Sequence, residues 1–149
     1  MVFKKKNMPS IIITGTCGFI GSNIVNRLTE LGYKTKNIDN LSFGNIKSIC
    51  NAKIQNSDFN DLSDFELNQY DILVHCATSN IIYAMNNPIE TFQNNAINTI
   101  KLFQRFKGKI IYTSTASVYG QADSIPTYED APIRTTNAYD QSKYIAELF

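Results

Sequence analysis

Short apolar runs alternate along the chain with segments in which apolar residues recur at helical spacing. The runs predict strands at about 10–14, 34–38, 53–55, 71–75 and 109–113. The first run has no polar alternation, which is typical of a strand buried on both faces. The helical segments lie at about 19–31, 61–67, 88–106 and from 137 onward. This alternation predicts an α/β fold, with a parallel sheet flanked by helices.

The last predicted helix ends on an apolar stripe that includes Ile145, Leu148 and Phe149. No glycine, cap or basic last turn closes it. Because natural domains rarely end in the middle of such a stripe, we expect a longer parent protein.

Composition and charge narrow the classes of function. The 149 residues carry a net charge of +1, so nothing suggests a nucleic acid or an acidic membrane surface as partner. No apolar run approaches the roughly 20 residues that span a bilayer. Three well-separated cysteines and one histidine, His75, argue against a disulfide framework and predict no metal site. Reduced thiols fit a cytoplasmic chain.

Three glycines follow the first predicted strand and open the first predicted helix. Gly15 would form the tight turn, Gly18 would let a pyrophosphate approach the backbone, and Gly21 would let the helix pack closely on the strand. The anion would then lie over the helix N-terminus, where free N–H groups and the helix dipole favour it. The alternative is a purely structural turn in an α/β protein that binds no nucleotide. The position of the motif between strand and helix favours dinucleotide binding and a Rossmann-type, doubly wound sheet.

Asp39 ends the second predicted strand, eighteen residues after Gly21. A carboxylate at this place can accept hydrogen bonds from the adenosine ribose diol, and it would repel a 2′-phosphate. NAD is therefore favoured over NADP as the cofactor. The alternative is that Asp39 caps the turn at 40–44.

Tyr139 and Lys143 lie four residues apart on the last predicted helix and so share one face. An ammonium near a phenol favours the phenolate, which would lower the pKa of Tyr139 and make it a usable base near neutral pH. Such pairs are common by chance on solvated helices. Hydroxyl residues at 113–117, including Thr115, follow the fifth strand, where ligands of open α/β sheets gather. By themselves these would be explained by turn chemistry.

Together these motifs resemble the NAD-dependent epimerase/dehydratase family, a group of extended short-chain dehydrogenases/reductases. The matching segments run along almost the whole chain: Thr-Gly-x-x-Gly-Phe-Ile-Gly-Ser at 14–22, Asp-Asn-Leu-Ser at 39–42, Ser-Asp-Phe at 57–59, Val-His-Cys-Ala at 74–77, Asn95 before Thr99, Ser-Val-Tyr-Gly at 117–120, and the Tyr139/Lys143 pair.

The resemblance implies a role for each matched residue. It assigns NAD binding to Gly15, Gly18, Phe19, Ile20, Gly21, Asp39, Asn40, Asp58, Phe59, Cys76, Ala77, Thr78, Asn95, Tyr139 and Lys143. Within this set, Phe19 and Ile20 would line the pyrophosphate turn. Asp39 and Asn40 would face the adenosine, with Asp58 and Phe59 by the adenine. Cys76, Ala77 and Thr78 would pass under the nicotinamide ribose side, with Asn95 bracing that segment. Thr115, Tyr139 and Lys143 would form the catalytic triad, and His75 would be structural.

The implied reaction is epimerisation of a nucleotide sugar, most commonly a UDP-sugar, through a transient 4-keto intermediate. Dehydratases of the family carry an Asp-Glu pair after the catalytic threonine, whereas this chain has Ala116 and Ser117. That difference favours an epimerase or a simple reductase. Asp140 replaces the usual glycine after the tyrosine and would add negative charge beside it.

Members of the family are about twice as long as this chain. We therefore expect 1–149 to be an incomplete Rossmann domain that lacks the substrate-binding C-terminal domain and has little activity alone. Full-length relatives form homodimers through helices that correspond to 88–106 and 139 onward. The alternative is a non-catalytic NAD-binding module or truncated pseudoenzyme.

Overall fold

A computed structural model describes residues 8–149, which form two compact units. The first unit comprises the residues up to Ala77 together with Arg105–Ile111. The second comprises Thr78–Gln104 and Tyr112–Phe149. Each unit carries a different part of the predicted site.

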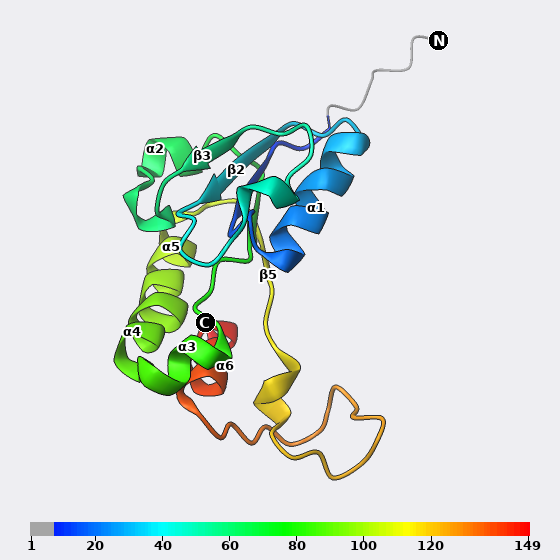
Figure 1. The fold of residues 1–149 in the computed structure, drawn as a ribbon, viewed down its shortest axis with the longest axis vertical. Helices are drawn as coiled ribbons and strands as arrows, with labels where there is room; N and C mark the ends of the chain where they lie inside the picture. The colour runs from blue at the N-terminus through cyan, green and yellow to red at the C-terminus, as the bar shows by residue number, and fades with distance from the viewer. Residues whose placement is uncertain (1–7) are drawn as a thin grey trace. The chain divides into compact units, whose positions relative to one another are not determined.

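The first unit is built on a five-stranded sheet (Figure 1). Its strands are β1 (Ile11–Thr14), β2 (Thr35–Asp39), β3 (Ile54–Asn56), β4 (Ile72–His75) and β5 (Lys109–Tyr112), in the spatial order β3-β2-β1-β4-β5. The pairings of β1 with β2, β1 with β4, and β2 with β3 are parallel. The predicted α/β fold with a Rossmann-type parallel sheet is confirmed. The order reverses direction at β1, and ligands of such sheets bind outside the carboxyl ends of the strands at this switch point.

Helix α1 (Phe19–Glu30) packs on this sheet (Figure 1). Val25 joins Ile11, Ile13 and Val74 in a buried apolar cluster, so the helical stripe and the apolar strands bury each other. The helix is followed by Gly32 at φ +76°, the left-handed conformation that glycine adopts at little cost.

Strand and helix boundaries differ from the sequence predictions by one to three residues. The predicted helix at 61–67 is the clearest case, because α2 covers only Asp64–Leu67. Ser63 and Glu66 form a capping box that fixes its start. The residues before it form the 3₁₀ turn η2 (Phe59–Asp61), and a further 3₁₀ turn, η1, covers Ile46–Ser48.

The second unit is helical. It contains α3 (Ile81–Asn86), α4 (Pro88–Phe92), the π-helix η3 (Gln93–Asn98), α5 (Thr99–Arg105), the 3₁₀ turn η4 (Ala116–Tyr119) and α6 (Ala138–Leu148). Helix α6 packs on α3, α4, η3 and η4. The single helix predicted at 88–106 is therefore three consecutive segments, and α3 was not predicted.

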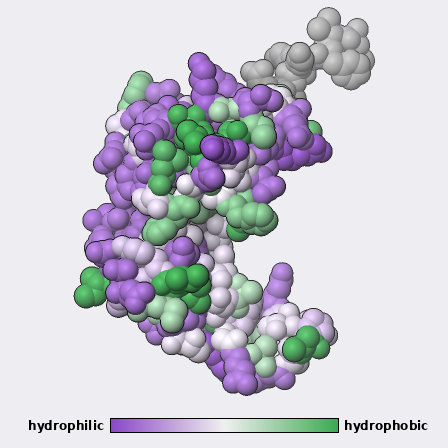
Figure 2. All heavy atoms as spheres, viewed as in Figure 1, coloured by the Kyte–Doolittle hydropathy of each residue, from purple (hydrophilic) through white to green (hydrophobic). Residues whose placement is uncertain are grey.

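Apolar side chains on the face shown in Figure 2 lie in small groups separated by hydrophilic ones. Among the described residues, no helix is long and apolar enough to span a membrane.

Candidate functional site

The glycine turn after β1 leaves no room for side chains at two of its positions. Gly15 has φ +74°, and a Cβ there would lie 2.4 Å from the backbone nitrogen of Ala77. A Cβ on Gly21 would lie 2.1 Å from the carbonyl oxygen of Gly15. Both glycines are thus required by the fold itself, and the turn lies directly against the segment that follows β4. The Cys76 N–H extends that strand by donating to the Thr14 carbonyl at 3.0 Å.

Gly18 differs from its two neighbours in the motif. A Cβ there would meet only the Gly15 carbonyl oxygen, at 3.4 Å, which is ordinary van der Waals contact. The fold alone therefore does not require this glycine. Gly18 is also the N-cap of α1, with no side-chain capping bond and no acidic residue in the first turn. Together these features fit close approach of an anionic group such as a pyrophosphate to the start of α1.

Phe19 and Ile20 follow Gly18 at the start of α1, and both are exposed. Phe19 is 87% exposed, which is unusual for a large apolar side chain and places it where a bound nucleotide could cover it. The structure thus places Gly15, Gly18, Phe19, Ile20 and Gly21 in the turn after β1 and the first turn of α1, and their contacts with NAD stay a prediction.

Asp39 joins the glycine turn to the loop after β2. Its Oδ2 accepts a hydrogen bond from the Cys17 N–H at 2.7 Å, and its Oδ1 accepts one from the Leu41 N–H at 2.7 Å. The second bond is the turn cap that the sequence left open as an alternative. Because each carboxylate oxygen has two acceptor directions, these bonds leave capacity for a ribose hydroxyl. Sequence reasoning missed the bond to Cys17.

The loop after β2 also packs closely on Cys17. A Cβ on Gly44 would lie 2.5 Å from the Cys17 Cβ, and the Asn45 N–H donates to the Cys17 carbonyl at 2.9 Å. Burial and the nearby Asp39 carboxylate raise the pKa of the Cys17 thiol. The thiol therefore stays protonated and acts as a packing group.

Asn40 and Asp58, both predicted to face the adenosine, contact each other. The Asn40 Nδ2 donates to the Asp58 Oδ2 at 2.9 Å, and Asp58 caps η2 by accepting from the Asn60 N–H. The Phe59 side chain is instead buried, with its ring edge-on to His75 at 5.0 Å. Only the backbone of Phe59 is then left to face a nucleotide. His75 is itself fully buried and hydrogen-bonded to Thr14 at 2.6 Å, in agreement with a structural role.

In the second unit, Lys143 is almost fully buried. Its ammonium donates to the Thr113 carbonyl at 2.7 Å and lies over the Tyr112 ring at 4.1 Å from the centroid. The residues that end β5 thus hold the lysine, and neither Tyr112 nor Thr113 was singled out from the sequence.

Tyr139 lies one turn before Lys143 on α6. Burial raises the pKa of Tyr139, the Thr115 side chain lowers it, and the Asp140 charge raises it, with a net rise above the ordinary value. The expectation of a lowered pKa is therefore wrong for the chain without cofactor. Burial of the phenol raises the pKa of Tyr139 more than the Thr115 side chain lowers it. The Lys143 ammonium donates its hydrogen bond to the Thr113 carbonyl.

Asp140, beside the predicted base, is 1% exposed. Its Oδ2 accepts hydrogen bonds from the Thr136 N–H at 3.2 Å and the Asn137 Nδ2 at 2.7 Å, so it closes the first turn of α6. Asp140 thus lies next to Tyr139 as predicted, and this cap explains why an aspartate is accommodated there.

Asn95 is buried within the π-helix and bridges two segments of the second unit. Its Oδ1 accepts from the Ser79 N–H at 2.7 Å, and its Nδ2 donates to the Ser79 carbonyl at 2.9 Å and to the Ser142 Oγ at 3.3 Å. The bridge braces the segment that begins at Thr78, whose own hydroxyl donates to the Ser79 carbonyl at 3.3 Å. Ser79 and Ser142 carry no signal of this role in the sequence.

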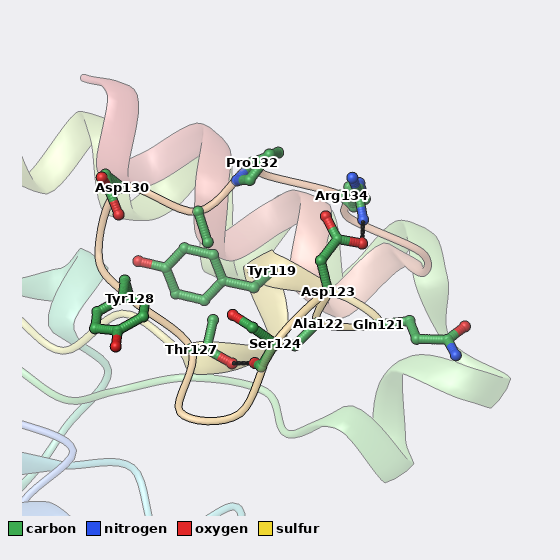
Figure 3. Close-up of a pocket in the computed structure, with 11 residues that line it drawn as sticks. Tyr119, Gln121, Ala122, Asp123, Ser124, Thr127, Tyr128, Asp130, Pro132 and Arg134 are labelled. Atoms are coloured by element: carbon green, nitrogen blue, oxygen red, sulfur yellow. Dashed lines mark hydrogen bonds and ion pairs between the residues drawn. The ribbon is translucent and has the colours of Figure 1, made fainter.

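A pocket lies in the loop between η4 and α6 (Figure 3). Tyr119 points into it, and the Arg134–Asp123 ion pair, 2.6 Å long, lies at one side. The Tyr119 hydroxyl donates to the Glu129 carbonyl at 3.2 Å. None of Thr115, Tyr139 and Lys143 lines this pocket, so it is separate from the predicted catalytic residues.

Comparison with known proteins identifies the family. The family model described as "NAD dependent epimerase/dehydratase family" matches residues 11–149. The chain belongs to this family. Its members are NAD-dependent by description, which agrees with the prediction of NAD as cofactor.

Relatives and solved structures agree with this assignment. The UDP-glucose 4-epimerase of Yersinia enterocolitica is 34% identical over an alignment of 156 positions, gaps included, that covers 93% of this chain and 46% of the relative. The UDP-N-acetylglucosamine 4-epimerase of Methanobrevibacter ruminantium, solved with UDP-N-acetylmuramic acid, has a TM-score of 0.86 and 30% identity over 94% of this chain and 48% of its own. The NAD-dependent NDP-hexosamine 5,6-dehydratase TunA has a TM-score of 0.85 and 26% identity over 95% and 48%. The chain thus spans about half the length of the relatives it matches.

Proposed function

We propose that this chain carries the NAD-binding part and the catalytic residues of a nucleotide-sugar 4-epimerase that acts on a UDP-sugar. The observation that carries the proposal is the buried Lys143 ammonium one helical turn after Tyr139, whose phenol interacts with the Thr115 side chain. This arrangement supplies a proton acceptor, a hydroxyl to share its proton and a fixed positive charge.

The first unit supplies most of the cofactor contacts in this proposal. The open backbone at Gly18 and the uncapped N-terminus of α1 receive the pyrophosphate, with Phe19 and Ile20 beside it. Asp39 receives the ribose diol of NAD. The remaining predicted cofactor contacts are Asn40, Asp58, the Phe59 backbone, Cys76, Ala77, Thr78, Asn95, Tyr139 and Lys143.

The second unit supplies the proton transfer. Tyr139 takes the proton from the C4 hydroxyl of the sugar, and Thr115 donates a hydrogen bond that stabilises the charged phenolate. The Lys143 charge favours the same phenolate electrostatically. NAD⁺ held by the residues named above would supply reversible hydride transfer at C4, which is the oxidation and reduction that this proton transfer needs. Tyr139 then gives the proton back, so the step balances over one turnover.

Epimerisation is favoured over dehydration by the residues that follow Thr115. Elimination of water from a sugar needs an additional acid and base. Ala116 and Ser117 follow Thr115 in η4, and neither is a carboxylic acid. The structural similarity to a dehydratase therefore reflects the shared fold, and the side chains available here fit epimerisation.

The relation to the longer relatives leads to a second part of the proposal. We propose that 1–149 is the N-terminal half of such an enzyme, in the cytoplasm, and that a C-terminal domain on the same or a separate chain binds the sugar nucleotide. The half-length matches to the relatives support it. Pairing of two copies through the helices of the second unit belongs to the same proposal.

A non-catalytic NAD-binding module is the second candidate. The raised pKa of Tyr139 favours it, because a phenol that holds its proton is a poor base at neutral pH. The two candidates share the cofactor and differ in turnover.

Calorimetric titration of 1–149 with NAD⁺ and NADP⁺ tests the proposal, with Gly18→Ala and Asp39→Ala as variants. We expect saturable NAD⁺ binding, weaker NADP⁺ binding and loss of affinity in both variants. Gly18→Ala is the cleaner variant, because Asp39 also carries structural hydrogen bonds. Absence of NAD⁺ binding by the folded chain would overturn the cofactor assignment. Conversion of UDP-glucose to UDP-galactose, assayed with a full-length parent or with an added C-terminal half, then separates an enzyme from a binding module.

A further inference from the structure

The Lys143 ammonium lies on the face of an aromatic ring. It is 4.1 Å from the Tyr112 centroid, and the lysine as a whole is 2% exposed. A cation in this position is attracted by the negative face of the ring, and the attraction is strongest where water is excluded. The ring therefore offsets part of the cost of burying the charge.

Two consecutive residues at the end of β5 make the two contacts. Tyr112 presents its ring to the ammonium, and the Thr113 carbonyl accepts its hydrogen bond at 2.7 Å. Phe103 packs edge-on against Tyr112, with centroids 5.5 Å apart and ring planes at 77°. This contact helps to hold the Tyr112 ring in place under Lys143.

Tyr112 faces the lysine as a neutral ring. Burial raises the pKa of its hydroxyl, and the charges of Tyr139 and Glu147 raise it further. Its hydroxyl lies 3.5 Å from the Lys143 backbone carbonyl, which is long for a hydrogen bond. The ring, and not the hydroxyl, is the part of Tyr112 that acts on Lys143.

We propose that Tyr112 is a positioning residue whose ring holds the Lys143 ammonium charged and fixed at the end of β5. The proposal rests on the catalytic role of Lys143 proposed above. It adds that an aromatic residue at position 112 is needed for that role and that its hydroxyl is not.

Other ionisable groups lie on α6 and on the elements packed against it, and they are the same in all Tyr112 variants. On α6 these are Tyr139, Asp140, Tyr144 and Glu147. From the elements packed against α6 they are Tyr83 of α3, Glu90 of α4 and Tyr119 of η4, while η3 has none. All are retained when only Tyr112 is changed, so a comparison of Tyr112 variants isolates the ring.

The test follows the loss of the Lys143 proton by ¹³C NMR of ε-labelled lysine, with the Lys143 signal assigned through Lys143→Arg. It uses the 1–149 chain without cofactor or substrate. We expect Tyr112→Phe to keep the wild-type midpoint and Tyr112→Leu to lower it by about one pH unit, as expected for loss of a desolvated cation–π contact. Phe103→Leu, which removes an aromatic ring that packs on Tyr112, is the matched control for loosened packing and should shift the midpoint less.

A variant that keeps an aromatic ring at position 112 covers the case in which Tyr112→Leu does not fold. Replacement of Tyr112 by 4-cyanophenylalanine keeps the ring but withdraws electron density from its face, so the midpoint should fall below that of Tyr112→Phe. Equal midpoints in these two variants would overturn the proposal, as would a Tyr112→Leu midpoint equal to that of the wild type. Because no nucleotide is present, failure here is distinguishable from failure of NAD⁺ to bind.

Discussion

A methyl group added to Gly21 would lie 2.1 Å from the carbonyl oxygen of Gly15. The first turn of α1 therefore rests directly on the backbone that leaves β1. The same addition at Gly18 meets that oxygen at 3.4 Å. Two glycines of one motif thus serve different purposes, one for the packing of the fold and the other for access to its surface.

Gly21→Ala is expected to destabilise the chain strongly, because backbone and not a flexible side chain blocks the added carbon. Overpacking of this kind costs about 1–3 kcal/mol or more. Urea denaturation followed by circular dichroism measures the free energy of unfolding. Gly18→Ala is the matched control and should stay close to the wild type. Similar losses in both variants would contradict the assignment of separate roles.

Asp39→Asn is expected to lower the free energy of unfolding by about 1.5–3 kcal/mol, the contribution of a hydrogen bond to a charged group. The amide cannot accept from both the Cys17 and Leu41 N–H groups, because one of its two ends is a donor. Chemical denaturation at pH 7 measures the change. Asp61→Asn, at an exposed position, is the control and should change stability little. A neutral result for Asp39→Asn would show that these two bonds are not structural.

Asn95→Ala is expected to destabilise the second unit, since it leaves the buried Ser79 N–H without its side-chain partner and removes one of the two hydrogen bonds to the Ser79 carbonyl. Each unsatisfied buried group costs about 1–3 kcal/mol. Hydrogen exchange at the Ser79 amide reports the loss locally, and thermal unfolding reports it globally. Asn98→Ala removes a bond to the exposed Gln93 and should have a small effect. Unchanged exchange at Ser79 would refute the bridge.

The stability of the chain is expected to fall as the pH rises above about 10. Burial raises the pKa values of Tyr112 and Tyr139 above the unfolded value of about 10. In that range the folded state holds more protons than the unfolded state, so the free energy of unfolding decreases with pH through the folded pKa values. Urea midpoints from pH 8 to 11 measure the slope. Tyr112→Phe should flatten it, whereas Tyr128→Phe, in an exposed loop, should not.

Asp140→Asn is expected to lower the pKa of Tyr139, because the Asp140 charge disfavours the phenolate. The amide has nearly the same shape and can still accept from the Thr136 N–H, so the first turn of α6 should persist. Titration of the ¹³Cζ signal of Tyr139 by NMR gives the pKa directly. Asp130→Asn in the exposed loop is the control. An unchanged or higher pKa in Asp140→Asn would show that Asp140 acts on the helix cap alone.

The strands could be predicted from the sequence because short runs of apolar residues are typical of strands buried on both faces. Ile11–Thr14 is buried throughout between β2 and β4, so its composition and its place agree. Helix α3 could not be predicted in the same way. Its six residues are too few to show a period, and its start depends on Asn80, whose side chain accepts from the Tyr83 N–H.

The candidate site shows the same division. The glycine motif predicts the turn after β1, because only glycine fits where the backbone of another segment lies so close. The Asp140 charge beside Tyr139 could be predicted, but the raised pKa of Tyr139 could not, since its largest cause is burial of the phenol, which depends on tertiary packing. The ring of Tyr112 under Lys143 depends on tertiary packing for the same reason.

The π-helix makes the length of one stretch as important as its composition. The rings of a π-helix close one residue later than those of an α-helix, and the Thr99 hydroxyl reaches the Asn94 carbonyl five residues back. Deletion of one residue other than Asn95 from Gln93–Asn98 would let this segment close as α-helix, with α4 and α5 near their present phase, and would change the directions of the side chains within it. A chain shortened in this way could retain Asn95, Ser79 and Ser142 and still lose the bridge that joins them.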